Sequence, residues 1–419
     1  MFNSEISMAR ELFRKNVKIV LTTLIVLFAI PSFGQMLGCT DPLASNFSSS
    51  ATQNDGTCTY ATASISASNA FSLPATVSET SGLIFWNGKL WTHNDDGDIQ
   101  LYAMDTANTT ALEIVPLTGT QNIDWEEISQ DQNYIYVGDF GNNLNGNRTD
   151  LKILRIEKNS ILTGVPIIDT LNFSYSNQQD FSQTGANNTD FDCEAFIVSA
   201  DSIYLFTKQW LTNACGVFSL SKNPGTHIAQ FKTTLNTDGL ITGAHFNEAD
   251  KVITLLGYST VLQPFIYLLY DFSSMDFMSG NKRKISVSLP FYQTEGITAV
   301  SPTRFFISNE YFSQSIITTL QQLHAVDLSS FLHTYLTADI SEHLQKTAFM
   351  FHPNPANNAI TIEGDFQIGD TINLFSSNGK LLQTVIADSN SELFMEISNL
   401  PNGVYLLKYK DFALEVLKR

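Results

Sequence analysis

Short hydrophobic segments separated by polar turns make up most of the chain. Between Tyr60 and Leu332, apolar residues either alternate with polar ones or form brief continuous runs. Asn, Asp, Gly, Ser and Pro stand between these segments, and no stretch has the spacing of a convincing amphipathic helix. This pattern predicts an all-β fold.

One hairpin pattern recurs along this region. Its clearest copy begins at Glu79, contains an apolar strand, turns at Asn87-Gly88 and ends with a second strand, Leu90–Thr92. Asn-Gly between two apolar segments is a strong hairpin signal. Four further copies cover Asp124–Asn143, Asp192–Trp210, Ile241–Tyr258 and Thr294–Tyr311.

Further strand-like segments follow each hairpin, so a repeat contains about four strands. Five such repeats predict a five-bladed β-propeller. Six blades are the alternative, because Ser64–Phe71 belongs to none of the five repeats. This segment fits better as an outer strand that completes the last blade and closes the ring.

The hairpins place one residue of each repeat at an equivalent position. The first strand of a blade lines the central channel, and its start lies beside the end of the second strand. Three carboxylates gathered there would repel one another unless a cation or protons neutralised them. Without clustered His or Cys, oxygen ligands favour calcium over zinc. The predicted ligands are Ser81, Glu126, Glu194, Thr242 and Glu295, with a second ring of Asn94, Asp95, Asp139, Lys208 and Glu310.

Two choices within this set are open to test. Only one of the neighbours Glu126 and Glu127 can face the channel, and Glu126 is preferred because of its register with Asp139. Each polar residue at a strand start also fits a simple turn-capping role. Recurrence in at least three repeats favours the cation site.

The N-terminus predicts export. Basic residues up to Lys18 precede the apolar segment Ile19–Ile30 and a small-residue exit at Gly34, as in a secretory signal peptide. The apolar segment is too short for a permanent transmembrane span. Four cysteines, an even number, agree with an oxidising compartment. Cys193 and Cys215 form either a disulfide bridge or two buried thiols.

The segment between Cys39 and Cys58 resembles a short module, CTDP…DG[ST]C.Y, of exported proteins from Bacteroidetes-type bacteria. The resemblance implies a loop closed by a Cys39–Cys58 disulfide. Such a loop offers the oxygens of Asp41, Asn46 and Asp55 to calcium. An Asx-rich loop that needs no metal is the alternative.

A new β-rich unit follows a polar connector at residues 333–346. Turns at Pro353-Asn354-Pro355, Asn378-Gly379 and Pro401-Asn402-Gly403 separate its strands, which predicts a small β-sandwich. The motifs PNPA, NG and GVYLLK, in this order at the end of the chain, resemble the sorting domain of the type IX secretion system. The resemblance implies transport across the outer membrane, removal of the domain and anchoring to surface lipopolysaccharide. A carbohydrate-binding sandwich is the alternative.

Charge narrows the choice of partners. The formal net charge is −18 over 419 residues, which disfavours nucleic acid and anionic membrane surfaces. The negative charge suits either binding of divalent cations or simple solubility.

The predicted organisation is a signal peptide (1–34), the disulfide-closed module (35–60), the propeller (61–332), a linker (333–346) and the sorting domain (347–419).

The repeat motifs also resemble a family of enzymes. SGL..WNGKLWT.ND, DWEEI…YIYVGD, D.EAF, TGA and EGI are distantly similar to the calcium-activated nucleotidases (apyrases), which are five-bladed. That likeness implies ligand roles for the five predicted calcium ligands. The chain departs from that family at two places. Residues 207–210 read TKQW where the family has an arginine pair, which concerns phosphate binding, and Thr242 replaces a serine of the ligand set.

Two functions follow as hypotheses. The preferred one is a metal-stabilised, secreted or surface module that binds a small molecule or glycan or serves as a scaffold. The alternative is a calcium-dependent hydrolase of nucleotides or other phosphate esters, which needs cationic groups near the metal. His93 and Lys208 are the catalytic candidates, although His93 also fits a turn and Lys208 an ion pair. Exposed aromatics such as Trp91, Trp210 and Tyr258 would favour ligand stacking.

Overall fold

The computed structural model describes residues 35–419 except 107, 315, 346–348, 365, 378 and 411. The predicted signal peptide, residues 1–34, lies outside the described residues. The chain divides into two compact units, Met1–Ser329 and Ser330–Arg419, and each is described by itself. Within the described ranges, no helix is both long and apolar enough to cross a membrane.

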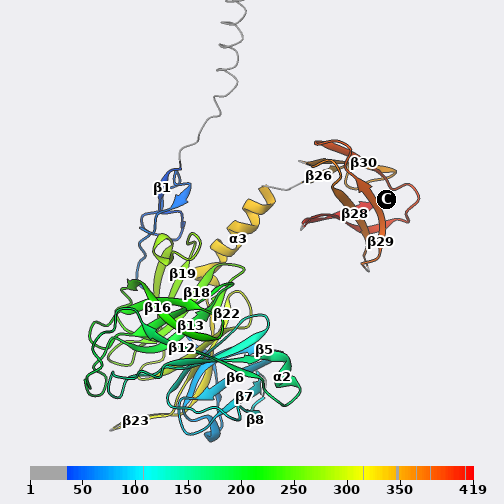
Figure 1. Ribbon diagram of the computed structural model, residues 1–419. Coiled ribbons are helices and arrows are strands. Elements are labelled where there is room, and N and C mark those ends of the chain that lie inside the picture. The colour runs from blue at the N-terminus through cyan, green and yellow to red at the C-terminus, as the bar shows by residue number, and fades with distance from the viewer. Residues whose placement is uncertain are drawn as a thin grey trace, which may run out of the picture. The chain divides into compact units, whose positions relative to one another are not determined.

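The large unit is built from β-strands, as predicted, and its strands radiate from a common centre (Figure 1). They form five four-stranded groups, which we call repeat sheets 1 to 5. Sheet 1 contains β5 (Thr80–Trp86), β6 (Lys89–Asn94), β7 (Gln100–Asp105) and β8 (Asn108–Pro116). Sheet 2 contains β9 (Trp125–Gln130), β10 (Tyr134–Asp139), β11 (Lys152–Glu157) and β12 (Ile168–Tyr175). Sheet 3 contains β13 (Asp192–Val198), β14 (Ser202–Lys208), β15 (Cys215–Ser221) and β16 (Gly225–Leu235).

The last two repeat sheets are completed by strands from the N-terminal part of the chain. Sheet 4 contains β17 (Leu240–Asn247), β18 (Val252–Tyr258), β19 (Pro264–Tyr270) and β20 (Asn281–Val287), to which β3 (Ala63–Ile65) adds in parallel. Sheet 5 contains β21 (Thr294–Ala299), β22 (Arg304–Asn309), β25 (Gln322–Asp327) and, outermost, β4 (Ser68–Ser72). The prediction of an outer strand for the last sheet is confirmed for β4.

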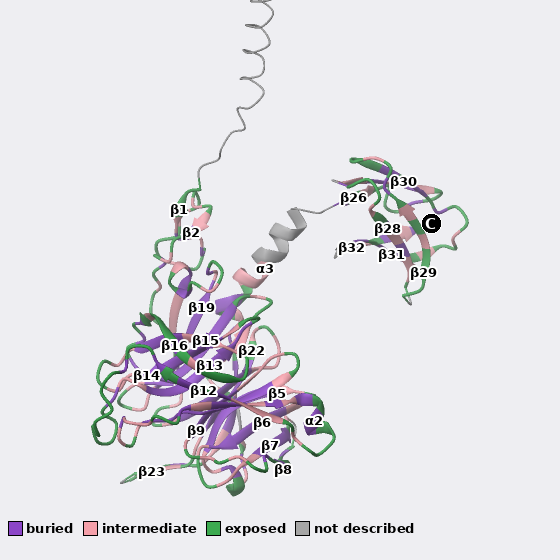
Figure 2. Cartoon of the chain, viewed as in Figure 1, coloured by how far each residue is buried: buried purple, intermediate pink, exposed green. Residues whose placement is uncertain are grey.

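The innermost strands are the first strands of the five sheets. They contact one another in the order β5, β9, β13, β17 and β21, and β21 contacts β5 again. The arrangement is therefore propeller-like, with the most deeply buried residues at its centre (Figure 2). The outer edges of sheets 2 and 3 also join, because β12 pairs in parallel with β16.

Smaller elements lie in the connections between strands of the large unit. They are the 3-10 turns Ala75–Val77 and Phe277–Ser279, the short helix α2 (Lys158–Leu162), and a separate hairpin of β23 (Phe312–Gln314) and β24 (Ile317–Thr319).

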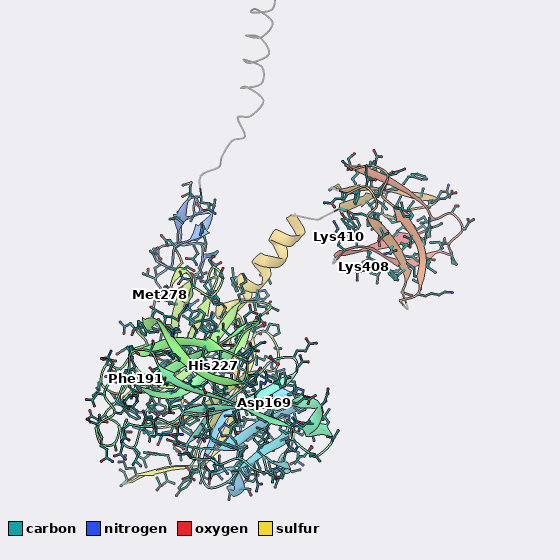
Figure 3. All side chains as sticks on the ribbon, viewed as in Figure 1. Asp169, Phe191, His227, Met278, Lys408 and Lys410 are labelled. Carbon is teal, nitrogen blue, oxygen red and sulfur yellow. A yellow bond between two sulfur atoms is a disulfide. The ribbon has the colours of Figure 1, made fainter. Side chains whose placement is uncertain are left out.

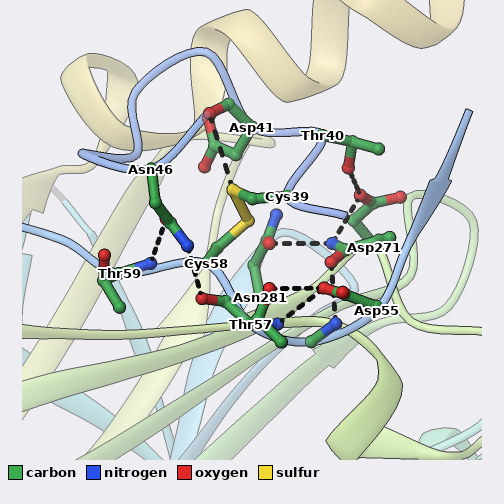
Figure 4. Close-up of a disulfide and its surroundings, with 12 residues drawn as sticks. Cys39, Thr40, Asp41, Asn46, Asp55, Thr57, Cys58, Thr59, Asp271 and Asn281 are labelled. Carbon is green, nitrogen blue, oxygen red and sulfur yellow. Dashed lines mark hydrogen bonds between the residues drawn. A yellow bond between two sulfur atoms is a disulfide. The ribbon is translucent and has the colours of Figure 1, made fainter. Parts of the chain in front are cut away.

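The disulfide-closed module contains the short strands β1 (Leu37–Gly38) and β2 (Gln53–Asn54). The predicted Cys39–Cys58 disulfide is confirmed (Figure 4). Hydrogen bonds fix the module to repeat sheet 4: Thr40 donates to Asp271, and Asn54 donates to Asp271 and Asn281. The module is therefore a packed part of the large unit.

The second bridge is not formed. Cys193 and Cys215 are free, buried thiols. They lie on β13 and β15, which are separated by β14. Two strands that are not neighbours lie roughly 9 to 10 Å apart, beyond the reach of a disulfide, which needs Cα atoms within about 7 Å.

The C-terminal unit contains two antiparallel sheets. One consists of β26 (Phe349–His352), β27 (Ala359–Gly364) and β30 (Glu392–Glu396). The other consists of β28 (Thr371–Ser376), β29 (Leu381–Ile386), β31 (Gly403–Tyr409) and β32 (Phe412–Lys418). Side chains of both sheets, such as Ile362 and Leu407, form one hydrophobic core. The polar segment read as a connector forms the helix α3 (Ser329–Gln345), which contains no glycine or proline.

Close packing at the centre generates a first prediction, at Gly82. Its φ of 62° is in the left-handed region, and a Cβ there would lie 2.5 Å from the Ile128 nitrogen and 2.7 Å from Glu127 Oε1. Gly88 has a similar φ of 74° but open space around it. We expect Gly82→Ala to lower the free energy of unfolding by about 2 kcal/mol or more, and Gly88→Ala by only about 1 kcal/mol. Urea denaturation measures both, and equal losses would contradict close packing at the ring centre.

Candidate functional site

A β-bulge shapes the inner strand of every repeat sheet. In four of these strands a single residue has no cross-strand partner, because the register shifts around it. In β5 the shift lies directly after Ser81. The four unpaired residues are Glu126, Glu194, Thr242 and Glu295. A bulge redirects the side chain that it carries.

The five predicted calcium ligands therefore occupy equivalent places, and all are buried, with 1% to 6% of each exposed. The bulge also corrects the predicted register by one residue. Asp139 lies opposite Trp125 rather than Glu126. Glu295, expected opposite Glu310, has no cross-strand partner, because Asn309 pairs with Thr294.

The two predicted hydroxyl ligands connect neighbouring inner strands. Ser81 Oγ donates to the main-chain oxygen of Glu126 at 2.6 Å, and Thr242 Oγ1 donates to that of Thr294 at 2.5 Å. Both residues thus tie one repeat sheet to the next.

Three buried carboxylates lie close together, and the backbone at Gly141 packs against them. One oxygen each of Glu126, Asp192 and Glu194 lies within 4.8 Å of the others, and all three side chains are buried. Gly141 covers this cluster, since a Cβ on it would lie 2.2 Å from Glu126 Oε1. Asn142 N and Trp210 Nε1 each donate to Asp192, at 2.6 and 2.7 Å. We call Glu126, Asp192 and Glu194 the carboxylate cluster.

Burial and mutual repulsion raise the pKa of these acids. Burial raises the pKa of Glu126 well above its usual value, and the charge of Glu194 adds to the effect. Burial likewise raises the pKa of Glu194, against the opposing influence of Lys208, and raises that of Asp124 to about 6. The negative form of the cluster is therefore costly without a cation.

Glu295 extends the acidic region. Burial raises its pKa to about 7, and its Oε2 atom has no hydrogen-bond partner among the described residues. Its charge acts on both Glu194 and Lys208. Unpaired buried oxygens are unusual in folded proteins and call for a ligand or a proton.

A second acidic group lies where the first and fifth repeat sheets meet. Oxygens of Glu79, Asp95 and Glu310 lie within 4.8 Å of one another, and these side chains are partly exposed. Burial, followed by the charge of Glu79, raises the pKa of Asp95 to about 7. Glu295 acts on Glu310 and so connects this group with the carboxylate cluster.

Other members of the predicted second ring have protein partners. Asp139 accepts ion pairs from Arg148 at 2.8 Å and from Lys152 at 2.7 Å. Asn94 Nδ2 donates to Thr76 O and to Asp98. Lys208 Nζ lies 3.1 Å from Glu194 Oε1.

Glu127, for which Glu126 was preferred as the predicted ligand, lies at the centre of the ring. Its carboxylate accepts the amide N–H groups of Ile128 at 2.9 Å and Ala244 at 2.7 Å, and also that of Leu83. These three residues belong to three inner strands. The equivalent positions, directly after Ser81 or the bulge residue, are Gly82, Ala195, Gly243 and Gly296. Glu127 thus fills space that four small residues leave.

His93, one of the catalytic candidates, is fully buried. Burial lowers its pKa to about 4, so the ring is neutral at pH 7, and it packs edge-on against Trp125. Trp91 and Tyr258, which the sequence suggested as exposed aromatics, are buried as well, and only Trp210 is partly exposed. Both buried rings lie on second strands, β6 and β18, which pack between their neighbours.

The N-terminal module keeps its predicted calcium oxygens in internal hydrogen bonds. Asp41 Oδ2 accepts the hydroxyls of Tyr60 and Tyr270, and Asn46 Oδ1 accepts Thr59 N. Asp55 Oδ1 accepts both donors of Thr57. The calcium prediction for this loop stays a prediction.

A separate small cavity of about 60 Å³ lies toward the other ends of the inner strands. Gln130, Val198 and His245 are among the residues that line it. The carboxylate cluster contributes nothing to its lining, so the cavity and the acidic region are distinct.

Asp124 and Asp192 were not predicted as site residues. Each stands two positions before a predicted glutamate, in the repeated pattern Asp-x-Glu. Side chains two apart in a strand share a face, so this repetition was the signal that could have identified them.

Comparison with known proteins assigns the end of the chain. Residues 350–419 match the family described as a secretion system C-terminal sorting domain. This part of the chain is a sorting domain. It directs the protein to the type IX secretion route and hence to the cell surface or the medium. Figure 3 labels Lys408 and Lys410 in it, at the end of β31 and just beyond.

The large unit has no such assignment, and no curated protein matches the chain. Similar solved structures include PorZ, a bacterial surface component of the type IX secretion system of Porphyromonas gingivalis (13% identity, TM-score 0.31). The match covers 81% of this chain but only 45% of PorZ. Others are a streptogramin B lyase (11%, TM-score 0.32, covering 83% and 96%) and an aldose sugar dehydrogenase from Streptomyces coelicolor (8%, TM-score 0.35, covering 61% and 98%).

The raised pKa values generate a second prediction. A carboxyl whose pKa is higher in the folded than in the unfolded state binds more protons when folded, so stability falls as pH rises between the two values. For Asp95 and Glu295 that window runs from their ordinary values to about 7. With chelator present, we expect a melting temperature several degrees higher at pH 5 than at pH 8.

The same measurement on Glu295→Gln should show a smaller pH effect, whereas Glu113→Gln, which changes an exposed residue, should leave it unchanged. A melting temperature that rose with pH over this range would contradict the assignment.

Proposed function

We propose that the chain is an exported five-bladed β-propeller that binds calcium at its central carboxylates and acts as a binding or scaffold module. The cyclic order of the inner strands supports five blades rather than six. The two-sheet C-terminal unit with its common core supports a β-sandwich.

The carboxylate cluster carries the metal part of the proposal. Its donors are oxygens alone, and their spacing suits calcium, which takes oxygen ligands at about 2.3 to 2.6 Å. Neighbouring Glu295 adds a buried oxygen, Oε2, that has no hydrogen-bond partner among the described residues. Glu126, Asp192 and Glu194 would hold the ion, with Glu295 within electrostatic reach. The ion would supply the charge that makes the ionised cluster stable.

The hydrolase alternative has less support. Phosphoryl transfer needs cationic groups free to meet the phosphate. Lys208 is paired with Glu194, and Arg148 is paired with Asp139 and Asp150. A binding role fits better with Trp210, which is partly exposed and donates to Asp192 in the cluster. The ligand would be a small molecule or glycan, with secretion machinery and surface lipopolysaccharide as partners during and after export.

Calcium should stabilise the full chain. At a concentration of about 100 times Kd, bound calcium adds about 2.7 kcal/mol to the free energy of unfolding. Glu126→Gln removes one ligand charge, so we expect the calcium-induced rise in melting temperature to shrink by at least half. Differential scanning fluorimetry with calcium and with chelator measures the change.

The melting temperature of this variant without metal provides a second test. Because Glu126→Gln also removes repulsion, its melting temperature in chelator should equal or exceed that of the unchanged chain. Glu113→Gln is the matched control. No calcium response in the unchanged chain would remove the metal from the proposal.

Export should depend on the sorting domain. A chain ending at residue 349 lacks all of β26 except Phe349, as well as β27 to β32, and should be retained inside a host that carries the type IX system. Immunoblots of cell, surface and medium fractions measure the distribution, with the full chain as control. Equal surface amounts of both chains would show that another segment directs export.

A further inference from the structure

Lys208 holds a cation inside the acidic region. Its Nζ atom lies 3.1 Å from Glu194 Oε1, and 4.9 and 5.2 Å from the ring centres of Trp210 and Tyr258. The residue is 4% exposed. A carboxylate and two aromatic faces, all of which attract positive charge, therefore surround the ammonium group.

The surrounding charges exceed what one ammonium group can neutralise. Lys208 interacts electrostatically with Glu194, Glu295 and Asp192, and also with Glu310. Glu126 and Asp124 add to the negative charge beside Asp192. The Oε2 atom of Glu295, a residue 6% exposed, is a second observation, because no donor among the described residues meets this buried acidic oxygen.

The ammonium group takes no part in the backbone ladder of its strand, and its ion pair with Glu194 joins β14 to β13. Backbone pairing of Lys208 with Asp192 and Cys215 is independent of the side chain. The ammonium group beside Glu194 partly neutralises this carboxylate, and any second cation that binds there must share Glu194 with Lys208.

We propose that Lys208 is an intramolecular cation that competes with the divalent ion for Glu194 and thereby limits the affinity of the site. Binding of the ion exchanges the Glu194–Lys208 ion pair for a Glu194–metal contact, while Lys208 stays near as a repelling charge. The identity of the ion rests on the proposed function, but the effect of Lys208 can be tested separately.

The test is isothermal titration of calcium into the full chain and three Lys208 variants. Lys208→Gln and Lys208→Met remove the charge, and the methionine keeps a linear apolar side chain against the two rings. Removing a nearby positive charge should lower Kd by more than about tenfold. Lys208→Arg retains the charge and should change Kd by less than about threefold.

A matched control is Lys222→Gln. Lys222 also forms a partly buried ion pair, with Asp131 at 3.2 Å, but is not among the groups that act on the carboxylate cluster. Its calcium affinity should equal that of the unchanged chain.

The outcomes separate the two proposals. If only the neutral Lys208 variants bind calcium, the inference stands and the proposed function of the unchanged chain fails. If the unchanged chain binds calcium and the neutral variants bind no more tightly, Lys208 is a purely structural ion-pair partner and the inference is overturned. If none binds, both fail.

Folding of the neutral variants is checked by circular dichroism. Should both be unfolded in chelator, refolding by calcium at concentrations below those that raise the melting temperature of the unchanged chain would support the inference. Failure to refold at any calcium concentration would contradict it.

Discussion

Carboxylates buried at the centre of the ring need neutralisation, because an ionised group that leaves water loses far more than it regains from a dry protein interior. This chain answers that need in three ways. Glu127 accepts three main-chain amides, Glu194 pairs with Lys208, and Asp139 pairs with Arg148 and Lys152. Among the described residues, Glu126 and Glu295 form no ion pair of their own, and the more distant charge of Lys208 favours their ionised forms. Their position, rather than their number, makes the centre a candidate cation site.

The bulges explain why these side chains gather. An unpaired residue in each inner strand breaks the alternation of the strand and redirects one side chain. The next position is small in four of the five strands, which lets the backbones approach closely around Glu127. The same local irregularity therefore supplies the acidic groups and the tight packing that keeps them in place. Substitutions at these positions therefore act on the packing of the ring as well as on its charge.

Local patterns in the sequence predicted much of this fold, and contacts between distant strands account for what they missed. Asn87-Gly88 and its counterparts identified the hairpins, and equivalent positions identified Glu126, Glu194 and Glu295. Turn geometry assumes uninterrupted pairing, however, so it could not show the one-residue shifts that the bulges cause. The role of Glu127 depends on amides from two other inner strands, which no local pattern contains. The Cys193–Cys215 alternative likewise depended on which strands are neighbours.

The compartment in which the protein works bears on the affinity of the proposed site. The sorting domain sends the chain out of the cell, where extracellular modules bind calcium with Kd values of about 10⁻⁴ to 10⁻³ M. A site with several carboxylates and no internal cation would be expected to bind far more tightly than that. An ammonium group fixed beside Glu194 weakens such a site and also neutralises part of it when no metal is bound. In the proposed site, one side chain would limit the repulsion among the carboxylates when no metal is bound and the affinity for the metal when it is.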